Sequence, residues 1–153
     1  MKRNRQIFWI GLLIYFLSFF LAAVGPFDAS KPMSGYFCAY ATLLFSWEQA
    51  KLWLHGVPSI NKPLEYVSVL ISGWINPAFL LAVLVTSDSP SKSSVVAGRI
   101  ILILMIPFCW IVFYYHQLYP REGYFLWIAG MLMVLFSHSA AHSMAGQLRY
   151  VSR

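Results

Sequence analysis

Two histidines near the end of the chain, His138 and His142, are spaced so that their imidazole side chains could share a metal ion. Residues four apart lie on one face of a helix, and a histidine pair of this kind binds zinc in metalloproteases. The glutamate of the protease motif H-E-x-x-H is replaced here by Ser139, so a zinc protease is not predicted. We expect two solvated histidines at the end of an apolar helix, with a metal shared by His138 and His142 as the alternative.

A second set of titratable side chains lies in loops or at the ends of apolar segments: His55, His116, Glu48, Glu65 and Glu122. If these residues converged, they could bind a metal ion or perform acid–base chemistry. Solvated polar residues are also the normal content of such positions. No glycine-rich phosphate loop, nucleophile elbow or Ser–Lys pair accompanies them. The sequence therefore predicts no catalytic residue and no cofactor, and favours a protein that is not an enzyme.

A polar stripe runs along the uncharged segment 66–87. Ser68, Ser72 and Asn76 recur every four residues and would share one face of a helix. Pro77 follows directly, lacks an N–H group and removes one helical hydrogen bond. The stripe could belong to a kinked helix that packs against its neighbours, or to a polar binding site at a broken helix, as in transporters. The residues of the binding site would be Ser68, Ser72, Trp74, Asn76 and Pro77.

The elements that position these residues are those of a membrane protein. Of the 153 residues, 59% are hydrophobic and 10% are charged, whereas soluble domains contain about 25% charged residues. We therefore predict one integral membrane bundle over residues 1–153, with the lipid bilayer as its environment. The net charge of +6 comes from basic residues scattered singly between apolar runs. This distribution is typical of topology signals, and nucleic acid is not an expected partner.

Four uncharged runs are long enough to cross a bilayer, which takes about 20 residues in a helix. We expect an all-α architecture with transmembrane helices near residues 7–26, 66–86, 100–118 and 123–143. A fifth segment, Gly35–Leu54, is interrupted by Glu48 and Lys51, and only the sixteen residues 32–47 around its start are uncharged. We predict that this segment is a re-entrant or interfacial helix. A chain with five transmembrane helices is the alternative.

The basic residues favour four crossings. With the N-terminus inside, four crossings place seven of the eleven Lys and Arg residues on the inner side, whereas five crossings place six there. Inner loops of membrane proteins carry the excess of positive charge, so the first arrangement fits better. It places His55 and His116 outside and the C-terminus inside.

Two short motifs give the chain a resemblance to other proteins. W-x-N-P stands at Trp74–Pro77, and G-Y-F-L-W stands at Gly123–Trp127. With these motifs, the chain resembles a loose group of small uncharacterised bacterial inner-membrane proteins. They share a first anchor, a W-x-N-P span, a basic inner loop and a last span that opens G-Y-[FY]-L-W. The resemblance implies a multi-pass location in the bacterial inner membrane and implies no activity.

Three functional hypotheses follow. The leading one is a non-enzymatic accessory or assembly subunit of a larger membrane complex, with a membrane protein or a second copy of this chain as partner. It is based on a small-residue seam that lets helices approach closely, formed in the first span by Gly11, Tyr15, Ser18, Ala22 and Gly25. The alternative is a small-solute or lipid carrier that uses the broken helix around Asn76 and Pro77. A membrane enzyme that uses the outer-face residues His55 and His116 is the third.

Overall fold

The computed structural model describes residues 2–26, 31–57, 62–87 and 92–151, and the side chains of 2–4, 85–87, 92–94 and 138–151 are outside this description. Most of this part of the chain is helical, in the elements α1 (Lys2–Ser18), α2 (Gly35–Leu54), α3 (Pro63–Ser87), α4 (Lys92–Tyr115) and α5 (Glu122–Val151). Three short strands join them, β1 (Ala22–Pro26), β2 (Met33–Ser34) and β3 (Leu118–Pro120). The predicted helical character is confirmed. The all-α prediction is wrong in one detail, because it leaves no place for the strands.

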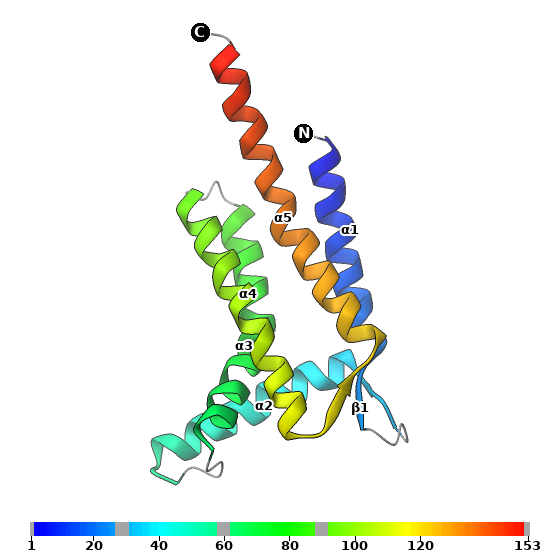
Figure 1. Cartoon of the computed structure of the whole chain (residues 1–153), viewed down its shortest axis with the longest axis vertical. Helices are drawn as coiled ribbons and strands as arrows, with labels where there is room; N and C mark the ends of the chain where they lie inside the picture. Colours follow the sequence, from blue (N-terminus) through cyan, green and yellow to red (C-terminus); the bar gives the residue numbers. More distant parts are fainter. Residues whose placement is uncertain (1, 27–30, 58–61, 88–91, 152–153) are drawn as a thin grey trace.

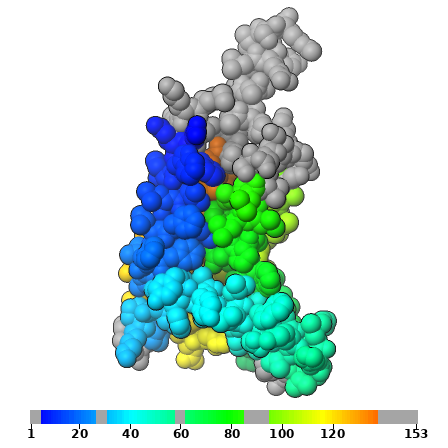
Figure 2. Space-filling model, turned by 180° about the vertical axis from the view of Figure 1, so that it is seen from behind, coloured from blue at the N-terminus to red at the C-terminus, as the bar shows by residue number. Residues whose placement is uncertain are grey.

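Four of the helices form two antiparallel pairs. The end of the bundle that contains α2 and the three strands is called the foot (Figure 1). α1 lies beside α5, and α3 lies beside α4 (Figure 1). α2 runs across the foot and packs against α3. Seen from behind, α2 crosses below both α1 and α3 (Figure 2). The segment 35–54 is therefore a helix that lies across the direction of the two pairs.

Two helices of the described residues are long and apolar enough to cross a membrane. They are the segments Pro63–Leu84 of α3 and Val95–Tyr115 of α4, with 22 and 21 residues. α1 and α5 contain shorter apolar stretches, Arg5–Ser18 and Glu122–Ser137. Length and composition thus support two of the four predicted transmembrane helices. Both α3 and α4 continue as helices through their prolines, Pro77 and Pro107.

The first predicted span, residues 7–26, extends too far. α1 ends at Ser18, and β1 follows as the middle strand of a sheet with the order β2-β1-β3. Val24 pairs with Met33 on one side and with Pro120 on the other. This antiparallel ladder supplies the backbone hydrogen bonds that the helix would otherwise provide. The third predicted span, 100–118, also extends too far at its end, because α4 ends at Tyr115 and residues 118–120 form β3.

The two similar openings, G-Y-F at Gly35 and at Gly123, occupy related positions in the foot. Each begins a helix directly against the chain that leaves α1. A Cβ atom at Gly35 would lie 2.7 Å from the carbonyl oxygen of Ser18, and one at Gly123 would lie 2.7 Å from that of Ala22. Real Cβ atoms do not approach oxygen this closely, so both helices can start here only with glycine.

The hydrophobic core lies between the two helix pairs. Its most buried members come from all four long helices: Tyr15, Ile75, Phe79, Leu102 and Met131. The ring of Tyr15 packs against that of Phe79, with 4.5 Å between the centroids. α1 meets α5 along the first part of the predicted small-residue seam, where a Cβ atom at Gly11 would be 2.7 Å from the Cβ of Met133. This part of the seam therefore joins two helices of this chain. Ala22 and Gly25, the last two residues of the predicted seam, lie in β1 instead.

Candidate functional site

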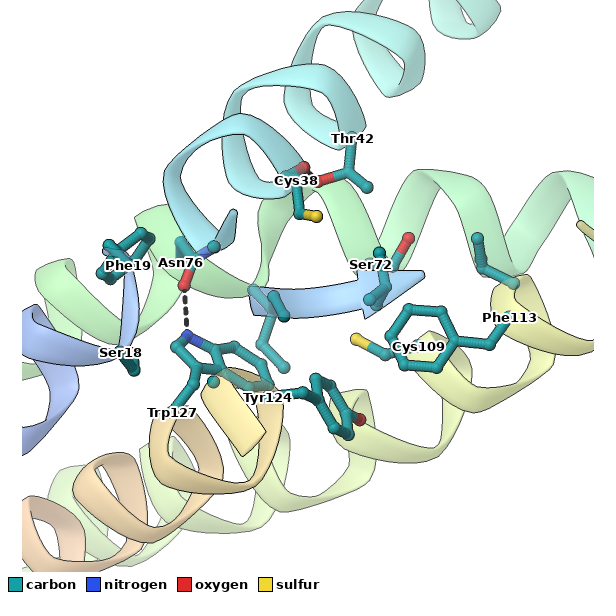
Figure 3. Close-up of a pocket in the computed structure, with 16 residues that line it drawn as sticks. Ser18, Phe19, Cys38, Thr42, Ser72, Asn76, Cys109, Phe113, Tyr124 and Trp127 are labelled. Atoms are coloured by element: carbon teal, nitrogen blue, oxygen red, sulfur yellow. Dashed lines mark hydrogen bonds between the residues drawn. The ribbon is translucent and has the colours of Figure 1, made fainter. Parts of the chain in front are cut away.

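Asn76 is the polar centre of the bundle. Its side-chain oxygen Oδ1 accepts hydrogen bonds from the hydroxyl of Tyr15 at 2.9 Å and from the indole Nε1 of Trp127 at 2.8 Å. Figure 3 shows the bond from Trp127. The three residues belong to α3, α1 and α5, and both donor side chains are buried. One amide oxygen thus connects three helices of the bundle.

The polar stripe of α3 faces the protein, as its spacing predicts. Ser68 and Ser72 are buried, and their hydroxyl groups donate to the carbonyl oxygens of Leu64 at 2.6 Å and Val69 at 3.2 Å. Asn76 and Pro77 are half-buried on the same helix. Trp74 is 45% exposed and lies on the opposite side of α3. Of the five predicted binding residues, Trp74 is therefore separated from the others.

Gly73 brings α2 against this stripe. A Cβ atom at Gly73 would collide with the Cβ of Ser46 and would lie 2.7 Å from the carbonyl oxygen of Thr42. Ser46 is fully buried at this crossing, and its hydroxyl makes no hydrogen bond to a described residue. The close contact holds the first half of α2 beside Ser72 and Asn76 and so shapes the space between them.

A cavity of about 80 Å³ lies at this junction, at the foot of the bundle. Its wall combines polar side chains with aromatic rings, drawn in Figure 3. The polar members are Ser18, Thr42, Ser72 and Asn76, the thiols are Cys38 and Cys109, and the aromatic members are Phe19, Phe113, Tyr124 and Trp127. Aliphatic side chains complete the wall, and most of its surface is apolar. The rings of Tyr124 and Trp127 are stacked, with 5.5 Å between their centroids. None of the lining residues is charged.

The serine and threonine hydroxyl groups in the wall donate hydrogen bonds to backbone carbonyl oxygens of their own helices. Ser18 donates to the carbonyl oxygen of Tyr15 at 2.6 Å, and Thr42 donates to that of Cys38 at 2.7 Å. Ser72 donates to Val69, as described above. A hydroxyl oxygen that has given its proton keeps its lone pairs as acceptors. Both hydrogen bonds of Asn76 described above end at its Oδ1. Its Nδ2 amide group and the hydroxyl group of Tyr124 are further donors among the lining side chains.

His55 and His116, the two histidines whose side chains the structure describes, do not form one cluster. His116 lies 3.8 Å from a carboxylate oxygen of Glu65 and contacts the ring of Phe45 edge-on. His55 is exposed at the end of α2, ten residues after Phe45 and thus about 15 Å farther along that helix. The structure therefore does not bring His55 and His116 together.

The acidic residues of the same predicted set are also dispersed. Glu48 pairs with Lys51 on the surface of α2 at 2.7 Å, whereas Glu65 approaches His116 between α3 and α4. Glu122 is exposed at the start of α5. The pair His138 and His142 lies in the last part of α5, where side chains are outside the described residues.

Several site residues, among them Tyr15, Trp127 and the two cysteines, are not singled out for this role by the sequence. Trp127 and Tyr124 belong to an aromatic helix opening that is typical of a membrane interface. Both are instead buried, at 8% and 5% exposure, while Phe125 between them is 52% exposed. The signal that separates them is helical spacing, since Tyr124 and Trp127 are three residues apart and face the bundle together.

No protein-family model matches the chain, and no curated protein or solved structure shows significant similarity to it. The resemblance to small bacterial inner-membrane proteins therefore stays a prediction.

Proposed function

We propose that the chain is a multi-pass protein of a bacterial plasma membrane and a non-enzymatic assembly subunit of a larger membrane complex. The location is supported by the low content of charged residues, 10%, and by the two apolar helices α3 and α4. Large apolar side chains also cover the outside of the described bundle, among them Trp9, Leu13, Leu81 and Leu104. Such a surface is unfavourable in water and favourable in lipid.

The observation that carries the proposal is that the polar side chains of the helices form their hydrogen bonds within the bundle. Asn76 joins α1, α3 and α5, and Ser18, Ser68, Ser72 and Ser137 donate to carbonyl oxygens of their own helices. The two hydrogen bonds to Asn76 connect different helices and so stabilise one arrangement of the bundle. The serine bonds satisfy each hydroxyl group within its own helix. Their geometry supports a rigid scaffold with apolar outer faces, which is what an assembly subunit requires.

The outer face of α1 is the surface we assign to the partner. Trp9, Leu13 and Phe16 follow one another at spacings of four and three residues and are each at least 49% exposed. The exposed Phe20 lies in the turn directly after the helix. The opposite face of α1 is occupied by α5. A helix that is held on one side and apolar on the other can pack along a second membrane protein.

The experiment is photo-crosslinking in living cells from residues 13 and 16, with a crosslinker at the exposed Leu104 of α4 as the matched control. We expect one membrane protein, foreign or a second copy, to crosslink from α1 and to co-purify in mild detergent at a fixed ratio. The double substitution H55A/H116A should leave this complex intact. Lipid adducts alone at all positions, together with a homogeneous monomer after purification, would contradict the assembly role.

A small-solute or lipid carrier is the second candidate, supported by the cavity beside Asn76. A carrier must expose such a site to the two sides of the membrane in turn. Reconstituted protein should then accelerate the equilibration of a solute across vesicle membranes. Equal rates with and without protein, over a panel of small neutral solutes, would exclude this candidate.

A further inference from the structure

We infer that the cavity at the foot of the bundle binds a small uncharged alcohol, with its hydroxyl group beside Asn76 and Ser72 and its carbon chain against the aromatic wall. This inference is independent of the assembly role. It rests on the construction, the chemistry and the size of the cavity.

The cavity is assembled from parts of the chain that are distant in sequence. Ser18 at the end of α1 and Phe19 directly after it form one side (Figure 3). α2 contributes Cys38 and Thr42, the start of α5 contributes Trp127, and β1, α3 and α4 close the remaining sides. Gly35 and Gly123 also line it, at the two helix starts that only glycine permits. The foot therefore holds these walls in a defined arrangement.

The chemistry of the wall selects a neutral ligand. Without a charged lining residue, an ionic ligand would lose its hydration and gain no counter-charge. Three lining residues, Asn76, Ser72 and Thr42, are called the polar corner. They offer an amide donor from Asn76 and acceptor oxygens from Ser72 and Thr42, whose own protons are already donated to the backbone. A hydroxyl group both accepts and donates, so it can satisfy this corner, whereas a ketone or an alkane cannot.

The size of the cavity limits the ligand. Its volume of about 80 Å³ is roughly half that of an engineered cavity of about 150 Å³ that binds benzene. The enclosed part of the ligand is therefore smaller than a six-membered ring. A hydroxyl group with a chain of a few carbons fits, whether it is a free alcohol or the hydroxyl end of a longer neutral lipid.

The chain contains its own reporters for a test, because both of its cysteines, Cys38 and Cys109, line the cavity. In the full-length protein in lipid nanodiscs, the rate of thiol modification by methyl methanethiosulfonate is measured for C38A and C109A separately. We expect saturating 1-butanol to slow the modification of both remaining cysteines at least fivefold. Equal membrane concentrations of 1-chlorobutane, which lacks the hydroxyl group, should slow it less than twofold.

Two matched variants test the polar corner. In S72A/T42V the half-protecting butanol concentration should rise at least fivefold. In S68A it should not change, because Ser68 is buried on the same helix with the same type of backbone bond but does not line the cavity. Size-exclusion elution and circular dichroism check that each variant is folded.

Protection by butanol alone would assign the site to free alcohols, and protection by 1-decanol as well would assign it to the hydroxyl end of a lipid. No protection by either alcohol overturns the inference. Equal protection by chlorobutane, or an unchanged butanol concentration in S72A/T42V, overturns it as well.

Discussion

At the scale of single residues, Asn76 explains why a polar side chain next to a proline stands in the middle of an apolar helix. Its oxygen is the acceptor for two buried donors, Tyr15 and Trp127. A buried donor that loses its acceptor costs about 1–3 kcal/mol. Hydrogen bonds between membrane helices contribute less on average, about 0.6 kcal/mol each, because the separated helices also find partners.

We predict that N76A lowers the free energy of unfolding in detergent by about 1–3 kcal/mol, because it leaves both donors without an acceptor. Y15F should have a smaller effect of about 0.5–1.5 kcal/mol, since the bond from Trp127 is kept. Both are measured by thermal or denaturant unfolding. L80A is the control on the exposed side of the same helix. An N76A protein as stable as L80A would show that the three-helix connection is not stabilising.

Cys38 gives a pH-dependent prediction. Burial raises the pKa of its thiol to about 11, because a thiolate is poorly solvated in apolar surroundings. The reactive thiolate is therefore scarce at neutral pH, and its fraction grows about tenfold for each pH unit below that pKa. In C109A, the maleimide labelling rate of Cys38 should rise about tenfold per pH unit, and thus about a hundredfold from pH 7 to pH 9. A rate that levels off near pH 8.5 would mean that the thiol is not buried.

The sequence predicts which face of α3 is buried, but it does not predict which residues that face contacts. The spacing of Ser68, Ser72 and Asn76 indicates one buried face, because a helix repeats every 3.6 residues and lipid does not accept polar groups. The donors of Asn76 lie 61 and 51 residues away in the chain, and no local pattern connects such distances. Trp127 adds a specific difficulty, since tryptophan near a helix start is as typical of a membrane interface as of a core.

At the scale of the elements, the small strands could not be predicted. β1 has five residues, β2 two and β3 three, which is too short for an alternating pattern to be visible. They exist because two connections, the one from α1 to α2 with β1 and β2 and the one from α4 to α5 with β3, meet at the foot and pair their backbones there. The sequence does contain one trace of this meeting, the repeated G-Y-F opening at Gly35 and Gly123.

The crossing of α2 and α3 yields a prediction with a matched control. G73A should destabilise the protein by about 1–3 kcal/mol, because the added methyl group collides with Ser46 and approaches the backbone of Thr42. G98A places its methyl group 4.0 Å from Ala82, in ordinary contact. It should be neutral or stabilise by up to about 1 kcal/mol, since alanine favours helix more than glycine. Equal unfolding midpoints for the two variants would contradict the close packing of α2.

For the whole molecule, the way the bundle crosses the membrane decides on which side the cavity and the two chain ends lie. We propose that α1, α3, α4 and α5 cross and that α2 lies at the outer foot. The exposed aromatic residues of α2, among them Tyr36, Tyr40 and Trp47, suit the headgroup region of a bilayer. The cavity would then lie near the outer side, and the N- and C-terminal ends of α1 and α5 would both be inside, in agreement with their common end of the bundle (Figure 1).

The measurement that tests this topology most directly uses a single cysteine placed after Arg153 in a C38A/C109A background. Intact cells are treated with a membrane-impermeant maleimide, with a second single-cysteine variant at position 55 as the outer reference. We predict that residue 55 is labelled in intact cells and that the C-terminal cysteine is labelled only after the membrane is permeabilised. Labelling of the C-terminal cysteine in intact cells would mean five crossings and would contradict the topology with four crossing helices.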